Sequence, residues 1–285
     1  MNETERYLFD LNGFLVLRGV LSEEEVDAIN AAIDTALPSW DVVTNSRSVI
    51  VGMPREHIEE ELQGTSAEDN RNPCYFYGGL MLDWGEPIRR LVGHRGIMPY
   101  LLEFMGPTFR LDHAFALLMK PGSRGLPSRG LPLHGTSTPY NPTEFYHFRN
   151  NRFFTGLTTV SVALTDAPRG SGGMCCIPGS HKSNLPLPRE LVNLNEPSDC
   201  VVQLPLRRGD MVVFPESLAH GTMPWKGHNE RRQLLFKYCP GHMQWMKRRP
   251  LVSKVYEWTP DQMEFLRDSW FREDVMYPWL QNVGS

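Results

Sequence analysis

Two histidines stand in local settings that suit ligands of a divalent metal. His134 ends the segment 131–134, which follows a loop rich in Gly, Pro and Arg, and His220 follows the apolar run 210–215. Imidazole is the commonest protein ligand for a borderline divalent metal, and two imidazoles with one carboxylate leave coordination positions open for substrate and oxygen. The chain has nine histidines, so only proximity in the fold can select this pair, and a structural role is the alternative for each.

An arginine follows the second histidine. Arg231 lies eleven residues after His220 and opens the apolar run 233–238, which reads as a strand. A guanidinium at the mouth of a barrel, near a metal, is suited to bidentate capture of a carboxylate. The pattern therefore predicts a site for a metal and a carboxylate ligand.

Aromatic side chains cluster after His134 and recur after His220. Substrate sites are mostly apolar with a few polar groups, so these residues could line a pocket. Packing at the mouth of a barrel explains them equally well. The candidates are Tyr140, Phe145, Tyr146, His147 and Phe148, with Trp225 further along the chain.

The elements that must position these residues change in character along the chain. A short strand is expected at 14–17, and Ser22 is a helix N-cap followed by three glutamates and an apolar face that ends near Pro38. The segment 41–85 reads as irregular, and a second helix is expected from Pro87 to about Met105.

Short apolar runs separated by turn residues dominate the rest, which indicates a sandwich or barrel. A closing helix is expected at 260–270, and no repeat or linker divides the chain. We predict one domain, 1–285, with a β core over about 109–240. The expected strands are 109–119, 153–164, 174–178, 200–206, 210–215 and 233–239.

Composition excludes several classes of partner. The 285 residues are 41% hydrophobic and 22% charged with a net charge of −4, which gives no reason to expect nucleic acid or an anionic membrane as partner. A membrane-spanning helix needs a run of about 18 apolar residues, and the sequence contains none. The acidic amino terminus lacks the features of a secretion signal, and the five cysteines contain no CxxC pair. We expect a reduced, cytoplasmic protein that acts on a small molecule; its oligomeric state is not encoded in these patterns.

Several motifs, taken in order, resemble the phytanoyl-CoA dioxygenase family, which is part of the iron(II)/2-oxoglutarate oxygenases. The resemblance covers about residues 6–240, and no single motif would be specific. The motifs are Asn12-Gly13-Phe14-Leu15-Val16-Leu17 at the amino end, Leu118-Met119-Lys120-Pro121-Gly122 with Leu131-Pro132-Leu133-His134, Ala163-Leu164-Thr165-Asp166 with Gly172-Gly173 and Pro178-Gly179-Ser180-His181-Lys182, and Gly209-Asp210 through His220-Gly221-Thr222 to Arg231.

The resemblance implies a mainly β, double-stranded β-helix (a cupin-like jelly roll) with flanking helices. It implies that His134 and His220 bind iron(II), and that Arg231 pairs with the far carboxylate of 2-oxoglutarate. Thr222 would add a hydrogen bond to that carboxylate. Arg232 competes with Arg231, because successive residues of a strand face opposite ways and only one can point inward. With oxygen, such a site oxidises an unactivated C–H bond. His181, in the glycine-rich turn, is interpreted as structural.

One residue departs from the family's pattern. The family has His-x-Asp or His-x-Glu at its first motif, whereas this chain has His134-Gly135-Thr136. Threonine is neutral, so Thr136 marks a vacant acid position. Water or hydroxide could fill it while hydroxylation persists, with Glu144 reaching in from the following loop.

Three further readings remain open. Chloride could occupy the vacancy, as in related iron halogenases; the metal site could have decayed into a non-catalytic ligand-binding module; or the chain could be a cupin-like metalloenzyme that does not use 2-oxoglutarate. Hydroxylation ranks first and halogenation second. Decay ranks third, because both histidines, Arg231 and Thr222 remain.

Overall fold

The computed structural model describes residues 1–37, 42–44, 48–51, 74–78, 81–120, 131–135, 141–192, 194, 198–246 and 255–270. Its helices are α1 (Glu3–Asn12), α2 (Glu23–Ala36), α4 (Glu86–Arg89), α5 (Met98–Met105), α6 (Arg189–Val192) and α7 (Pro260–Phe265), with 3-10 turns η3 (Met81–Trp84) and η5 (Ser180–Lys182). Its strands are β1 (Leu15–Leu17), β2 (Val42–Thr44), β3 (Ser48–Val51), β4 (Cys74–Gly78), β5 (Arg110–Met119), β6 (Leu131–His134), β7 (Tyr146–Arg149), β8 (Arg152–Thr155), β9 (Thr158–Ala163), β10 (Gly173–Cys176), β11 (Val202–Gln203), β12 (Met211–Pro215), β13 (His220–Met223) and β14 (Arg231–Cys239).

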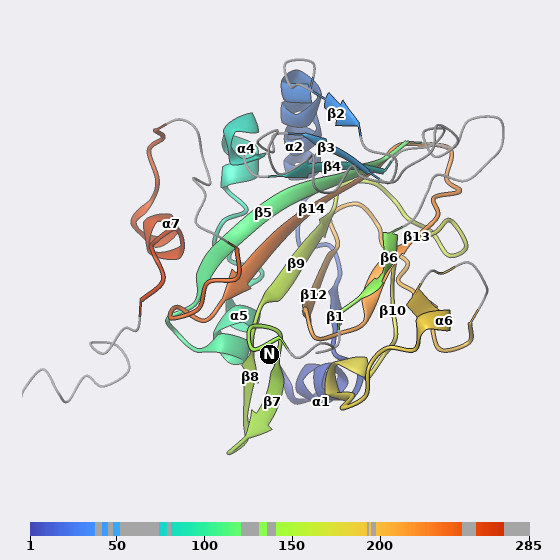
Figure 1. Ribbon diagram of the computed structural model, residues 1–285. Helices are drawn as coiled ribbons and strands as arrows, with labels where there is room; N and C mark the ends of the chain where they lie inside the picture. Colours follow the sequence, from blue (N-terminus) through green and yellow to red (C-terminus); the bar gives the residue numbers. More distant parts are fainter. Residues whose placement is uncertain are drawn as a thin grey trace, which may run out of the picture.

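Two sheets face each other and form the core (Figure 1). The large sheet has the strand order β1-β12-β9-β14-β5-β4-β3-β2, and the small sheet has the order β11-β10-β13-β6. Strands far apart in sequence are neighbours throughout, as in the pairing of β14 with both β5 and β9. The predicted jelly-roll fold with flanking helices is confirmed.

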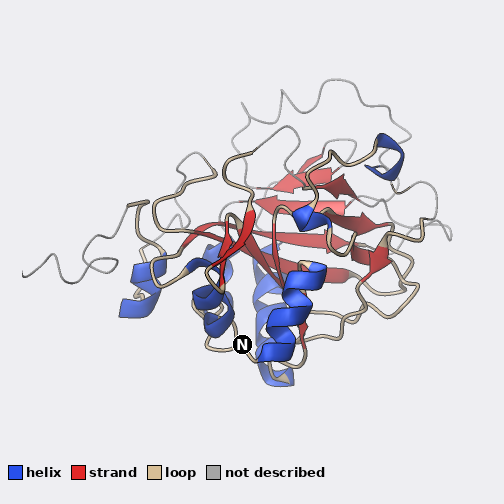
Figure 2. Cartoon of the chain, turned by 90° about the horizontal axis from the view of Figure 1, so that it is seen from below, coloured by secondary structure: helices blue, strands red, loops and turns tan. Residues whose placement is uncertain are grey.

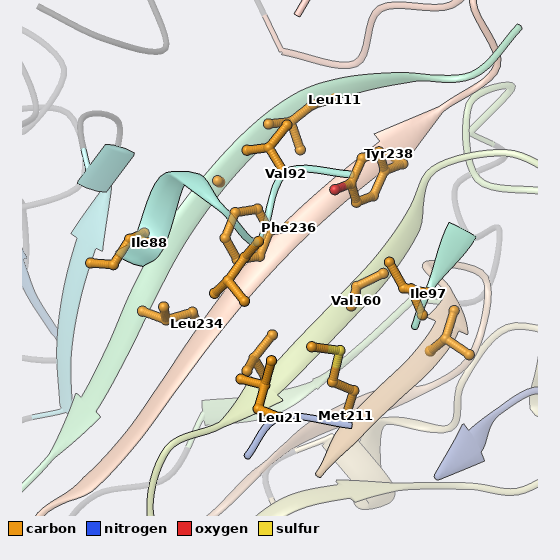
Figure 3. Packing of buried hydrophobic residues seen from close by; sticks show 14 of the residues in the cluster. Leu21, Ile88, Val92, Ile97, Leu111, Val160, Met211, Leu234, Phe236 and Tyr238 are labelled. Atoms are coloured by element: carbon orange, nitrogen blue, oxygen red, sulfur yellow. The ribbon is translucent and has the colours of Figure 1, made fainter. Parts of the chain in front are cut away.

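Helices cover the outer face of the large sheet (Figure 2). The apolar stripe of α2, Val26, Ile29 and Ile33, is buried in one cluster with the outward-facing residues of β5, β9 and β14. Figure 3 shows part of this cluster, in which Leu234 and Phe236 lie near Ile88 and Val92, and Val160 lies beside Ile97. This layer closes one side of the sheet and leaves the opposite face to line the interior between the sheets.

The alternation of strand residues determines which side chains enter that interior. Leu117 and Met119 of β5 and Phe214 of β12 belong to the cluster between the sheets, together with Met174 and Cys176 of the small sheet. By the same alternation, Arg231, Gln233 and Lys237 of β14 face inward. Polar side chains thus enter the interior along one strand.

Several predicted elements have different bounds in the structure. The helix predicted at 87–105 is two helices, α4 and α5, because the chain turns at Gly93, where φ is +73° and a Cβ would overlap the Phe265 ring. The strand predicted at 153–164 is divided at Gly156, whose N–H donates to the Phe145 carbonyl. The segment predicted as irregular contains β2, β3 and β4, and the closing helix ends at Phe265.

The amino-terminal region agrees with its sequence signals except for one helix. The Ser22 N-cap is confirmed as a capping box with Glu25. Helix α1, which was not predicted, begins with an equivalent box between Asn2 and Glu5. In the described part of the chain no helix is both long and apolar enough to cross a bilayer.

Candidate metal centre

His134 and His220 are directly opposite each other in the antiparallel pair β6–β13. Their ring centroids are 4.2 Å apart, and the ring of Phe214 lies 4.6 Å from that of His220. His220 is buried, whereas part of the His134 side chain is exposed. The structure therefore brings together the two histidines that the sequence singled out and orients both toward one space.

Backbone carbonyls fix which ring nitrogen of each histidine is free. His134 Nδ1 lies 3.1 Å from the Pro132 carbonyl oxygen, and His220 Nδ1 lies 2.7 Å from that of Leu218. A carbonyl only accepts, so each Nδ1 carries the proton and each Nε2 is left with a lone pair. This is the tautomer that a metal-binding histidine requires.

Glu216 supplies an acid to this pair. The ligand atoms of His134, Glu216 and His220 all lie within 4.8 Å of one another, and Glu216 Oε2 is 3.8 Å from His220 Nε2. Glu216 directly follows β12, where its N–H donates to the Leu157 carbonyl. The expectation of a site without an acid, based on Thr136, is not confirmed; Thr136 itself lies outside the described residues.

A glycine lets the Glu216 turn approach His134. Gly135 has a φ of +94°, and a Cβ there would overlap the carbonyl oxygens of Glu216 and Leu218. Only glycine combines that backbone conformation with so close an approach. Gly135 therefore brings the strand that carries His134 against the turn that carries the carboxylate.

The Glu216 carboxylate is buried but has two donors. Thr159 Oγ1 donates to Oε1, and Lys237 Nζ donates to Oε2 at 2.6 Å. Burial alone would raise the pKa of Glu216, but the charge of Lys237 and its hydrogen bond outweigh burial and hold this pKa below its usual range. Glu216 is therefore an anion in the barrel interior.

Burial also keeps both imidazoles neutral. It lowers the pKa of His220 to about 3, with a further contribution from His134 nearby. The pKa of His134 is lowered mainly by desolvation in the same way. The site thus presents two neutral imidazoles and one carboxylate at neutral pH, which is the protonation state that binds a divalent metal.

Arg231 and Arg232 point to opposite sides of the large sheet. Arg231 is 2% exposed, and its Nη1 lies 3.5 Å from Met119 Sδ inside the barrel. Arg232 lies toward the helices and pairs with Asp34 at 2.5 Å and Glu230 at 2.7 Å. The Arg232 side chain thus points away from the interior, which leaves Arg231 as the candidate for the co-substrate.

Gly173 makes room for Arg231. A Cβ on Gly173 would lie 2.8 Å from Arg231 Nε, and φ at this residue is +85°. Gly173 belongs to β10, next to β13, where Thr222 pairs with Met174 and is buried. The guanidinium of the large sheet therefore reaches across the barrel to the strand beside Thr222.

The structure places the aromatic residues predicted to line a pocket in different parts of the fold. Trp225 is buried in the cluster between the sheets, and its Nε1 donates to the Asn229 carbonyl. Phe145 stacks on His147 and packs against Leu157 and Met243. His147 itself is exposed on the β7–β8 hairpin. Tyr140 lies outside the described residues.

Glu144 is not the acid of this cluster. Its Oε1 accepts a hydrogen bond from Trp245 Nε1 at 3.0 Å, and its pKa is raised, mainly by burial and then by the charge of Glu216. The described group of metal-compatible side chains contains Glu216 instead. The suggestion that Glu144 completes the site is therefore not supported.

The turn Pro178-Gly179-Ser180-His181 supports the strand of His220. Ala219, the residue before His220, donates its N–H to Ser180 Oγ, and its carbonyl accepts from the Ile177 N–H. His181 is buried beneath α1. The structural interpretation of this turn agrees with these contacts.

Sequence reasoning missed Glu216, although the residue lies within a quoted motif. The family pattern places the acid two residues after His134, and the loop that follows offers Glu144. A carboxylate directly after a buried strand, four residues before a candidate ligand, was the available signal.

Comparison with known proteins agrees with this architecture. The phytanoyl-CoA dioxygenase (PhyH) family matches residues 9–233. The dioxygenase cdmD of Talaromyces verruculosus is 22% identical over 240 residues, covering 81% of this chain and 71% of its own. The peroxisomal phytanoyl-CoA dioxygenase of Rattus norvegicus is 22% identical over 237 residues, covering 76% of this chain and 62% of its own.

A solved structure shares the fold. HygX from Streptomyces hygroscopicus, with nickel and 2-oxoglutarate bound, has a TM-score of 0.67 at 18% identity, covering 86% of this chain and 89% of that one. The family match spans most of the chain and confirms the enzyme class predicted from the motifs, with its iron(II) and 2-oxoglutarate, at the level of the family. The chain belongs to the phytanoyl-CoA dioxygenase (PhyH) family of iron(II)/2-oxoglutarate-dependent dioxygenases.

Proposed function

We propose that this protein oxidises an unactivated C–H bond of a small molecule, using iron(II), 2-oxoglutarate and oxygen, with the iron held by His134, Glu216 and His220. The observation that carries the proposal is that these three side chains converge in the barrel that also contains Arg231. The acidic ligand would then come from the turn before the second histidine rather than from the residue two places after the first.

The donor set fits iron(II). Two imidazole nitrogens and one carboxylate form the set used by non-haem iron(II) oxygenases, which leaves positions open for the co-substrate and oxygen. The carbonyls of Pro132 and Leu218 fix both rings with Nε2 free, as required of ligands. Iron supplies the oxidising chemistry when bound, and the protein supplies orientation and a dry cavity.

Arg231 is the proposed partner of the far carboxylate of 2-oxoglutarate. It is buried and faces inward, and Gly173 leaves space beside its guanidinium. Thr222 follows His220 by two residues on the same face of β13, about 7 Å along the strand. A five-carbon dicarboxylate could therefore extend from the histidines toward Thr222 and Arg231.

Hydroxylation is favoured over chlorination by Glu216. The chloride hypothesis needs a metal site without an acidic ligand, whereas Glu216 lies close enough to supply that charge. If Glu216 were instead only a neighbour of the metal, chloride could still enter. Products formed with and without chloride, compared by mass, decide between the two reactions.

Known structures of this fold include complexes with small molecules. HygX has been solved with hygromycin B, and the epimerase SnoN with nogalamycin RO. These ligands belong to those proteins, but they support a small-molecule substrate for this chain. Tyr140, Phe145, His147 and Trp225 remain the candidates for contact with it.

The test is the absorption of the protein with iron(II) and 2-oxoglutarate in the absence of oxygen. The proposal predicts the weak visible charge-transfer band of an iron(II)–oxoacid chelate. It also predicts that His134→Ala, His220→Ala and Glu216→Ala each remove the band while the circular dichroism spectrum is kept. A folded protein that binds neither iron(II) nor 2-oxoglutarate would indicate a non-catalytic binding module. Turnover that survives Arg231→Ala would favour a cupin-like enzyme without 2-oxoglutarate.

A further inference from the structure

Lys237 places a positively charged ammonium group beside the candidate metal centre. It lies on β14, opposite Thr159 of β9 and His113 of β5, with its side chain in the barrel interior. Its Nζ is 2.6 Å from Glu216 Oε2, and this same oxygen is 3.8 Å from His220 Nε2. The ammonium and the imidazole thus approach one carboxylate oxygen.

The neighbouring groups leave Glu216 as the acid that Lys237 contacts. Asp112, another buried carboxylate, lies on β5 and already accepts from His113 Nδ1 at 2.7 Å and from the N–H groups of Trp245 and Met246. Lys237 Nζ otherwise lies 5.5 Å from the centre of the Phe115 ring. The charge of Glu144 also interacts with Lys237, but the carboxylate to which Lys237 donates its hydrogen bond is Glu216.

We propose that Lys237 is an internal counter-ion, which stands in for the metal at Glu216 in the metal-free protein and weakens the affinity of the site for divalent cations. The inference rests on the proposed function, since it assumes that Glu216 faces the metal. A buried carboxylate without a partner strongly destabilises a fold, so a charge balance at Glu216 is needed before metal enters. Lys237 supplies that balance from within the chain.

The same ammonium opposes the metal once it is present. A dication that reaches Glu216 must lie within a few ångströms of Lys237, because both approach the same carboxylate. Repulsion between a single and a double positive charge at such separations is substantial in a poorly solvated interior. Lys237 therefore stabilises the metal-free protein and disfavours the metal-bound one, and these effects have opposite signs.

The test removes the positive charge of Lys237 but keeps a hydrogen-bond donor at that position. Lys237→Gln removes the ammonium, and Lys237→Arg retains a cation. Tag-free protein is titrated with nickel(II), which is stable in air, by calorimetry, and thermal unfolding is recorded with and without nickel(II). Lys182→Met is the matched control, because Lys182 also pairs with a carboxylate, that of Asp10 at 3.1 Å, but on the surface.

The expected result is that Lys237→Gln binds nickel(II) roughly tenfold or more tightly than the wild type, while its metal-free form unfolds at a lower temperature. Lys237→Arg and Lys182→Met should retain the wild-type affinity. A merely structural lesion would lower the stability of both forms and would not tighten binding. If Lys237→Gln folds only with metal, it is prepared with nickel(II), and its affinity is measured by competition with a chelator.

Unchanged or weaker nickel(II) affinity in folded Lys237→Gln overturns the inference. That outcome leaves the proposed function standing if wild-type binding is lost in His134→Ala and the iron(II)–2-oxoglutarate band is present. A wild-type protein that binds no nickel(II) overturns both.

Discussion

Glu216 and His134 lie 82 residues apart in sequence, yet the Glu216 carbonyl packs directly against the residue that follows His134. This contact explains how a chain with His-Gly-Thr at its first motif can still present an acid beside two histidines. The acid is placed by the turn between β12 and β13, and Gly135 allows that turn to approach. Each step of this arrangement can be tested separately.

The first prediction concerns the charge of Glu216. Glu216→Gln keeps the shape of the side chain but removes the anion, so we expect nickel(II) affinity to fall by roughly 100-fold. The metal-free variant should also unfold at a lower temperature, because Lys237 would remain buried without an anionic partner.

Glu144→Gln is the control for this experiment, because that carboxylate contacts Trp245 and is not part of the cluster. It should bind nickel(II) like the wild type. If Glu144→Gln lost affinity while Glu216→Gln kept it, the assignment of the acid would have to be reversed. Calorimetric titration of folded protein measures both.

The second prediction uses the opposite orientations of two adjacent arginines. Arg231→Met should raise the KM for 2-oxoglutarate on the order of 100-fold, because a buried guanidinium–carboxylate pair would be lost. Arg232→Met removes the pairs with Asp34 and Glu230 and the hydrogen bonds to Asn30, all at the helix-covered face. It should leave that KM unchanged and cost no more than about 1 kcal/mol of stability. Equal effects of the two substitutions would contradict the assignment.

The parts of this site that rest on local patterns could be predicted from sequence, and the parts that rest on contacts between distant segments could not. His134, His220, Arg231 and Thr222 occur in local patterns, and the alternation of a strand already implied that only one of the two arginines could face inward. The resemblance favoured Arg231, but its orientation depends on which face of β14 the helices cover. That follows from packing between β14 and α2, which are far apart in sequence.

Glu216 was harder to identify for a different reason. Its role depends on the register of β6 with β13 and on the close approach at Gly135, and neither is encoded by nearby residues. Lys237 likewise reads as one polar residue in an apolar strand until β14 is placed beside β9. The fold was predictable because alternation and turn residues recur along the whole β core.

The third prediction compares two glycines with nearly the same backbone conformation. Gly173 and Gly170 have φ of +85° and +86°, but a Cβ on Gly173 would meet Arg231, whereas one on Gly170 would meet nothing within 4 Å. Gly173→Ala should therefore raise the KM for 2-oxoglutarate about tenfold or more by displacing the guanidinium. Gly170→Ala should carry a similar backbone cost, about 1 kcal/mol, without that effect. Indistinguishable KM values would show that Gly173 does not position Arg231.

The fourth prediction is that Gly135→Ala weakens the metal site. The added methyl group would overlap the carbonyl oxygens of Glu216 and Leu218, so the turn must move away from His134. We expect nickel(II) affinity to fall about tenfold or more. Gly106→Ala is the control, since Gly106 also has a positive φ, +75°, but has open space around it. Full affinity in folded Gly135→Ala would mean that the turn tolerates the displacement.

The fifth prediction concerns His181 and the dependence of stability on pH. His181 is 5% exposed, lies against Gly13, and meets the Tyr146 ring edge-on at 4.4 Å. Burial, with a smaller contribution from Lys182, lowers its pKa to about 4 from the 6.5 of an unperturbed histidine. Between these two values the unfolded chain binds a proton that the folded protein does not. The contribution of neutral His181 to the free energy of unfolding is therefore fully present above about pH 6.5 and is lost as the pH falls toward 4.

His181→Phe keeps a ring at this position and removes the titrating group. Between pH 7 and pH 4.5 the wild type should lose about 2 kcal/mol more free energy of unfolding than the variant, as measured by urea denaturation. Other buried histidines, including His113 and His220, add to the pH dependence of both proteins equally and cancel in the difference. Parallel pH profiles for the two proteins would show that His181 takes up its proton in the folded state, and that the contact between α1 and this turn is open to solvent.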